Sequence, residues 1–519
     1  MWSGLRSLRS DGGNVLQREL NAYTVVSVLV TASFLFIFIF LPLSYLASKT
    51  SIESIYDAIF GKYSWIFIDS LLFSFKQAII SATISIVAGG FVAYASLRVS
   101  RRLSEALRIL SFVAFMMPST VVATSFYATY GIRGIPLGKG FWGIISAHVF
   151  YNAPLAYIYV YSALSTMSRE LVESLEFYAM RNKLKYYYTL LRMILPAVVS
   201  SWTLAFVYCF TSFAIPLTLG GPKYWTLEVY IYYTTRILNN YGLGAFMALL
   251  QVLIVGTVLF LIRKYERAAP SGAAELRRDF RFIWAPILYL IYELLPLLSL
   301  VFHAFYDPFS RSFTLRALSI LSDPIVLRAG LNTLYFALLA TLISLIIGTI
   351  ASMNIHSMRI SYSSLLTSSV VLGLGLYALY SDRIPTWILI PIAHALVALP
   401  LASTNLYVGR SRIPQEINEM CRLYNVRGVR YYLDVYIPLV FESFLTAIMF
   451  SIVVSIGEFG ATYMLYQRSY ETLSVLVYRL TSARRLLEAS LISTLIVLLS
   501  SLLSLGILKV RRGDYRIEV

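Results

Sequence analysis

The chain has 519 residues, of which 58% are hydrophobic and 13% charged, and its mean hydropathy is +0.72. A soluble protein of this length needs far more polar surface, so the composition indicates a polytopic membrane protein. Two cysteines, Cys209 and Cys421, are too few and too far apart for a disulfide framework, and four histidines argue against a metal path.

Apolar runs long enough to cross ~30 Å of hydrocarbon predict twelve membrane spans in two sets of six. The first run is too long for a signal-peptide core, and we expect it to be retained. The first set lies near residues 22–47, 66–97, 109–130, 141–165, 197–219 and 242–262. The second set lies near residues 282–304, 326–353, 362–380, 385–408, 439–466 and 487–508.

The net charge of +17 is distributed as a topology signal. If the amino terminus lies inside, most Lys and Arg fall in loops on that same face, including Arg101, Arg102, Arg410 and Arg412. The positive-inside rule therefore predicts a multi-pass protein of the cell membrane with both termini in the cytoplasm. Nucleic-acid binding is not needed to explain the charge.

Two matching sequence motifs show that the membrane unit is duplicated. Ala147-His148-Val149 followed by Pro154 matches Ala393-His394-Ala395 followed by Pro400, at a constant offset of 246 residues. Because each copy has six spans, the second copy enters the membrane in the same direction as the first. This predicts a parallel repeat rather than the inverted repeat of many secondary transporters.

The chain divides accordingly into two repeats and a joint. We expect a first repeat of six spans over 1–262, a cytoplasmic linker over 263–281 and a second repeat of six spans over 282–519. The linker is rich in Ala, Pro, Ser and Gly between charged residues, which is typical of a fusion joint.

A polar loop is repeated with the spans, over 169–196 and 409–438. In each copy two glutamates three residues apart are followed by an asparagine, tyrosines and a proline. This order predicts a helix, a sharp bend at the asparagine and a short amphipathic helix, with the next span beginning at Pro196 or Pro438.

The loop resembles a known element. The second copy, Glu419-x5-Asn425-x9-Val435-x-Ile437-Pro438, has the spacing of the cytoplasmic EAA loop of binding-protein-dependent ABC import permeases. The first copy has one extra residue after Asn182. Both copies carry asparagine where the family has glycine.

Other phrases are similar to the same family. Residues 142–156 and 212–228 resemble thiamine permeases, and Gly457-Glu458-Phe459-Gly460-Ala461-Thr462 resembles a phrase of thiamine, ferric-iron and oxyanion permeases. The resemblance covers both halves. It implies an all-α membrane protein with the type I ABC importer permease fold.

The resemblance also implies partners and a coupling role. In such importers each loop docks on a cytoplasmic ABC ATPase, expected as a dimer, and an extracytoplasmic solute-binding protein delivers the cargo. The loop residues that would carry this coupling are Glu173, Glu176, Asn182, Tyr187, Glu416, Glu419, Asn425 and Tyr432.

No G-x4-G-K-[ST] phosphate loop occurs in the sequence, so ATP hydrolysis is expected on a separate subunit and this chain is not expected to be an enzyme. No cofactor or metal is expected.

Polar residues inside spans are candidates for the cargo path, namely Lys76, Gln251 and Glu458. Lys76 could instead pair with a neighbouring helix or reach toward the interface. Gly457 and Gly460 beside Glu458 would permit a break in the helix. His148 and His394, at equivalent positions, favour helix-packing hydrogen bonds over metal binding.

Two other classes remain open. An ion-coupled secondary transporter with twelve spans is the alternative, although it has no need for twin docking loops. A membrane-embedded transferase would need a cluster of acids or histidines at one face, and Asp307, Asp323 and Asp382 are scattered. For the cargo, thiamine is the first choice and ferric iron the second.

Overall fold

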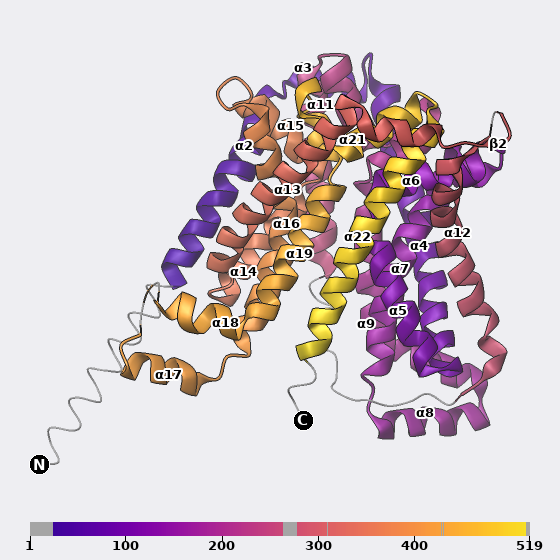
Figure 1. Cartoon of the computed structure of the whole chain (residues 1–519), viewed down its shortest axis with the longest axis vertical. Helices are drawn as coiled ribbons and strands as arrows, with labels where there is room; N and C mark the ends of the chain where they lie inside the picture. The colour runs from indigo at the N-terminus through magenta and orange to yellow at the C-terminus, as the bar shows by residue number, and fades with distance from the viewer. Residues whose placement is uncertain (1–23, 263–277, 309, 427, 429, 515–519) are drawn as a thin grey trace, which may run out of the picture.

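The protein is an almost entirely helical bundle, seen here in a computed structural model (Figure 1). The structure describes residues 24–262, 278–308, 310–426, 428 and 430–514, without the side chains at 169, 176, 178–181, 262, 422, 432 and 511–514. Most of the predicted linker, 263–281, therefore lies outside the described residues.

The first repeat opens on a helical span over Thr24–Lys49, which contains a π turn η1 (Phe36–Phe40) and α2 (Leu41–Lys49). Its other elements are α3 (Ile52–Ile59), α4 (Ser64–Val99), α5 (Arg101–Phe115), α6 (Ser119–Phe126), η2 (Tyr127–Gly131), η3 (Pro136–Gly138), α7 (Gly140–Ser165), α8 (Arg169–Arg181), α9 (Lys183–Phe210), η4 (Pro216–Gly220), η5 (Pro222–Tyr224), α10 (Leu227–Tyr232), η6 (Tyr233–Ile237) and α11 (Tyr241–Ile262).

The second repeat contains the one hairpin of the described residues, in which β1 (Tyr306–Asp307) pairs antiparallel with β2 (Ser312–Phe313). Its helices are η8 (Phe280–Phe282), α12 (Trp284–Phe305), η9 (Arg316–Ser322), α13 (Pro324–Ala351), α14 (Ile355–Ser361), η10 (Tyr362–Leu366), α15 (Ser369–Tyr380), α16 (Thr386–Ser411), α17 (Gln415–Leu423), η11 (Tyr431–Tyr436), α18 (Ile437–Leu439), α19 (Phe441–Gly457), α20 (Gly460–Met464), η12 (Arg468–Tyr470), α21 (Leu473–Ser482) and α22 (Leu486–Asp514).

About twelve spans result, as the sequence predicted. Within the described residues, eight single helices are long and apolar enough to cross a membrane, and three bent helix pairs raise the number to eleven. The remaining predicted span is α7, which has 26 residues and is largely buried. Its hydropathy is lower because it carries His148, Asn152 and several tyrosines, which its neighbours shield from lipid.

Equivalent contacts confirm that the two repeats are built alike. In the first repeat the Ser74 hydroxyl on α4 accepts a hydrogen bond from the Leu227 amide at 2.7 Å. In the second repeat the Thr333 hydroxyl on α13 accepts one from the Leu473 amide at 2.8 Å. Each bond satisfies an amide in the first turn of a short helix, α10 or α21, that the helix itself leaves free.

The first span of each repeat packs on the other repeat. The Ser27 hydroxyl bonds Ser357 at 2.9 Å, and α2 packs on α15. In the opposite sense, Tyr289 on α12 bonds Ser111 at 2.9 Å and Tyr292 donates to the Ser146 carbonyl at 2.5 Å. Figure 1 shows the indigo first span beside the orange second repeat and α12 beside the purple first repeat. The repeats are therefore interlocked.

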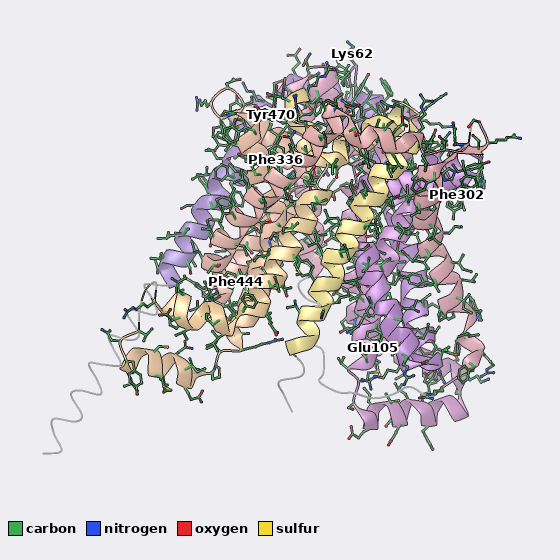
Figure 2. All side chains as sticks on the ribbon, in the orientation of Figure 1. Lys62, Glu105, Phe302, Phe336, Phe444 and Tyr470 are labelled. Atoms are coloured by element: carbon green, nitrogen blue, oxygen red, sulfur yellow. The ribbon has the colours of Figure 1, made fainter. Side chains whose placement is uncertain are left out.

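The two polar loops lie at one end of the bundle. We call the end that carries α8 and α17 the loop end and the opposite end the far end. Within the loop end, α8 and α17 lie at opposite sides (Figure 1). Figure 2 labels Glu105 and Phe444 toward the loop end, and Lys62 and Tyr470 at the far end.

Candidate functional site

The first polar loop is a helix and a bend, as predicted, but the helix that follows is the 28-residue span α9 rather than a short amphipathic helix. Between α8 and α9, Asn182 has an extended backbone and its side chain accepts a hydrogen bond from the Lys185 amide at 3.0 Å. It is therefore the N-cap of α9 rather than a left-handed turn residue. The prediction that the span begins at Pro196 was wrong, because Pro196 lies inside the 28-residue α9. Losing one donor kinks so long a helix without ending it.

The second loop bends differently. Asn425 has φ of +53°, the left-handed conformation predicted for it, and the Val426 amide bonds the Cys421 carbonyl at 2.7 Å just beyond α17. Pro438 lies in α18, and the segment Leu433–Leu439 meets α19 at 68°. The bend here thus falls both at the asparagine and after the proline, whereas α9 runs on unbroken.

Most of the predicted coupling residues are exposed. The side chains of Glu173, Glu416, Glu419 and Asn425 lie at the surface, and Tyr187 is 47% exposed. Glu176 lies in α8 and Tyr432 in η11, but their side chains fall outside the described residues.

Two loop tyrosines make defined hydrogen bonds, one with the bundle and one within its own loop. Tyr186 is buried, and its hydroxyl lies 3.3 Å from that of Tyr94 and accepts from the Arg98 guanidinium at 3.2 Å. In the second loop, Tyr431 donates to the Asn418 side chain at 2.8 Å. The helical position of Tyr186, one turn after the Asn182 cap, could have indicated this inward direction.

Four interrupted helices form the centre of the bundle. The chain leaves helical geometry around residues 116–118, 211–213, 367–368 and 458–459. The predicted break at Glu458 is thereby confirmed. Gly457 lies against Pro118 of the other repeat, and Gly460 lies against Ser369. Discontinuous helices that meet at one depth are typical of transporter binding sites.

A histidine holds the second-repeat break together. The two ring nitrogens of the buried His394 lie 2.7 Å from the hydroxyls of Ser455 and Thr462, one before the break and one after it. The equivalent His148 has only Ser81 at 3.5 Å, and its Nε2 has no partner among the described residues. The prediction that both histidines serve helix packing holds for His394.

Two carboxylates lie near each other at the interface between the repeats. Glu458 accepts from the Ala461 amide at 2.9 Å, and Glu228 of the opposite repeat lies on α10, which packs on α15 as α20 beside Glu458 does. Gln251, a predicted path residue, is buried and donates its amide to Glu228. Glu228 was noted in the sequence only as part of the segment 212–228 that resembles thiamine permeases, because its partner Gln251 lies on another helix.

Lys76 lies away from this centre. Its side chain is exposed on α4, with the ammonium 5.4 Å from the centre of the Phe141 ring, whereas the next residue, Gln77, is buried and donates to the Cys209 carbonyl at 2.7 Å. This placement favours the interpretation of Lys76 as a surface anchor.

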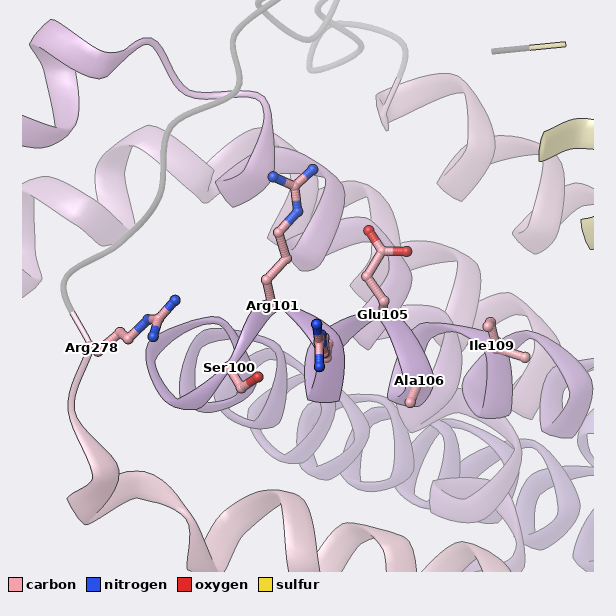
Figure 3. Close-up of a pocket in the computed structure, with 7 residues that line it drawn as sticks. Ser100, Arg101, Glu105, Ala106, Ile109 and Arg278 are labelled. Atoms are coloured by element: carbon pink, nitrogen blue, oxygen red, sulfur yellow. The ribbon is translucent and has the colours of Figure 1, made fainter. Parts of the chain in front are cut away.

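A basic cleft of about 760 Å³ opens beside the start of α5 (Figure 3). Its lining includes Arg101, Arg102 and Arg278, with Glu105 in an ion pair with Arg108 at 3.3 Å. The cleft belongs to the first turn of α5 and the approach to α12, and none of the four interruptions lines it. It adds to the positive charge of the loop end.

Comparison with known proteins agrees with this architecture. Residues 82–267 match the family described as "Binding-protein-dependent transport system inner membrane component". The thiamine transport system permease protein ThiP of Escherichia coli K12 is 25% identical over 474 residues, 83% of this chain and 87% of the relative. ThiP of Haemophilus influenzae is 25% identical over 488 residues, 86% and 89% of the two chains.

A shorter relative covers about one repeat. The spermidine/putrescine transport system permease protein PotC of Haemophilus influenzae is 25% identical over 205 residues, 38% of this chain and 79% of the relative. The long relatives span both repeats, and the short one spans a single unit of the kind that is duplicated here. The chain thus carries a region similar to the binding-protein-dependent transport family, and over most of its length it resembles fused, two-half permeases with the type I importer fold.

Proposed function

We propose that the chain is the transmembrane subunit of an ABC importer, moving a small solute inward by alternating access driven by a separate ATPase. The observation that carries the proposal is the pair of polar loops at one end of the bundle, each exposing acidic residues and each leading into a membrane span. Two equivalent loops suit the two subunits of an ATPase dimer.

Motion can pass from the loops to the spans because the loops are rigidly connected to them. In the first repeat, Asn182 joins α8 directly to α9, whose far-end portion runs to the break at Thr211. In the second repeat, η11 and α18 lead into α19 and the break at Glu458. A push on either loop is thereby transmitted to a central break.

The proposed orientation places the loop end in the cytoplasm, with both termini on that side. Arg101, Arg102 and Arg278 gather there, and the positive-inside rule assigns such a face to the cytoplasm. The far end would then receive the extracytoplasmic binding protein. The protein crosses the lipid bilayer many times, and no nucleic-acid partner is proposed.

Charge reversal of the loops tests the coupling role. In Glu173→Lys/Glu419→Lys, the amount of ATPase that co-purifies with the chain from native membranes should fall by about tenfold, which corresponds to roughly 1.4 kcal/mol. The matched control is Glu53→Lys, an equally exposed glutamate on α3 at the far end. ATPase recovery equal to that of the control would overturn the proposal.

For the cargo we propose thiamine, with ferric iron second. The two long relatives are named as thiamine permeases, while the shorter one is named for spermidine and putrescine. A binding assay on the partner solute-binding protein, comparing thiamine, spermidine and ferric iron, separates these cargoes. Uptake that follows an ion gradient and persists without ATP would instead favour a secondary transporter.

A further inference from the structure

Six aromatic side chains form a continuous cluster where the two repeats meet. The Phe213 and Phe459 rings stack with centres 5.4 Å apart and planes at 23°. Tyr463 stacks on Phe459 at 5.0 Å and contacts the other rings. The cluster, which we call the ring cluster, consists of Phe213, Tyr232, Phe459, Tyr463, Tyr466 and Tyr478.

The ring cluster follows the duplication. Phe213 and Phe459 are separated by the same 246 residues as His148 and His394, so they are equivalent residues of opposite repeats. The same offset relates Tyr232 to Tyr478. Equivalent residues can meet only at the axis that relates the repeats. The ring cluster therefore lies on this axis, at two of the four helix breaks.

Exposure differs between the two sides of the breaks. Phe213 and Phe459 are 5% and 2% exposed, whereas Tyr208, one turn toward the loop end, is 38% exposed although it contacts Phe115 at 6.0 Å. The two stacked rings are therefore buried beside the breaks, and α8 and α17 lie apart at the loop end (Figure 1).

Two buried acidic side chains lie near the ring cluster. Neither Glu228 nor Glu458 forms an ion pair with a described residue, although both are buried. The Gln251 side-chain oxygen beside Glu228 is also buried without a partner. The first turn of α15 lies against both carboxylates, through Ser368 and Ser369. Two buried carboxylates without a paired cation favour a positively charged cargo.

Aromatic faces add to this preference, because their negative centres attract cations. The rim of the ring cluster already shows such a contact. The Arg236 guanidinium lies 4.3 Å from the centre of the Tyr377 ring and donates to the Tyr466 carbonyl at 3.3 Å. A neutral cargo could use only the apolar surface of the rings, and an anionic cargo would be repelled by ionised carboxylates.

We propose that the ring cluster is the far-end gate of the permease and that it admits an organic cation, drawn by the ring faces and by Glu228 and Glu458. This inference rests on the proposed transport function and deepens it by assigning the cargo class to named residues. In the closed state the stacked rings seal the interface between repeats. Cargo passes when the stack opens and the π faces and carboxylates become accessible.

A leak assay on the purified chain alone tests the gate without any partner protein. Phosphatidylcholine vesicles carry the wild-type chain or Phe459→Ala, and the fluxes of choline, a quaternary ammonium, and erythritol, a neutral solute, are measured. Wild type should leak neither. Phe459→Ala should leak choline about tenfold faster than erythritol, and adding Glu228→Gln/Glu458→Gln should remove that ratio.

Phe126→Ala is the matched control, because Phe126 is a fully buried ring outside the ring cluster that contacts Phe150 and Tyr292. Tyr463→Ala provides a second gate variant if Phe459→Ala does not fold. The gate proposal is overturned if neither Phe459→Ala nor Tyr463→Ala raises the leak rate above that of Phe126→Ala. A leak without preference for choline, or a preference that survives loss of both carboxylates, overturns the cation assignment. Loss of ATPase binding in the loop variants bears on coupling alone, so the two failures are distinguishable.

Discussion

Glycines at equivalent positions show how closely single residues fix the packing of the long helices. A Cβ at Gly89 on α4 would lie 2.1 Å from the Ala153 carbonyl oxygen on α7. At the equivalent Gly348 on α13, the nearest atom, the Ala402 Cβ, would lie 3.4 Å away. Only the first position requires the absence of a side chain.

We predict that Gly89→Ala destabilises the protein by about 1–3 kcal/mol, because the backbones of α4 and α7 would have to separate. Gly348→Ala is the matched control and should change the stability little. Melting temperatures of the purified variants in detergent check this. Equal losses of stability in Gly89→Ala and Gly348→Ala would mean that the helices around the two glycines are packed equally closely.

Predictions for single residues were correct where the residue type has few structural roles. The glycines around Glu458 indicated a helix break, and a histidine ahead of a proline indicated a packing bond, which His394 makes. Glu228 was missed because its partner, Gln251, lies on another helix, and no local pattern shows that pairing.

At the scale of elements, the two polar loops reach similar positions by different turns. Asn182 caps α9 with its side chain, whereas Asn425 turns the chain with a left-handed backbone. The sequence predicted one bend for both, because Asn suits either use. The difference follows from the path of the chain after each asparagine, which depends on contacts distant in sequence.

The two uses of asparagine predict opposite tolerance to serine. Asn182→Ser keeps a capping oxygen and should be nearly neutral, whereas Asn425→Ser should weaken its turn by about 1 kcal/mol, because serine lacks asparagine's tolerance of the left-handed region. Asn425→Gly, which suits positive φ, should restore the turn. Hydrogen–deuterium exchange over α17 and the first turn of α9 measures both. Faster exchange around Lys185 in Asn182→Ser would contradict the capping role.

At the scale of the whole molecule, the sequence could predict twelve spans and a parallel duplication but not the exchange of first spans. Span number follows from hydropathy, and direction follows from the even number of spans per repeat. Which helix packs on which depends on side-chain fit, as between Tyr289 and Tyr157, whose rings stack at 6.1 Å across the repeat boundary. Apolar helices in lipid carry no sequence mark of that choice.

The interlocked architecture predicts how the halves behave when the joint is cut. Chains ending at Ile262 and beginning at Arg278 should co-purify when they are expressed together, because each contributes its first span to the other through contacts such as Ser27 with Ser357 and Tyr292 with Ser146. Removing residues 1–49 from the first chain should lower the recovery of the second by about tenfold, since α15 and α14 lose the helix that covers them. As a control, replacing residues 1–23 alone leaves those contacts in place and should keep the recovery. Equal recovery of the second chain with and without the first span would show that the exchange of first spans contributes nothing to assembly. The halves would then be independent units joined only by the linker.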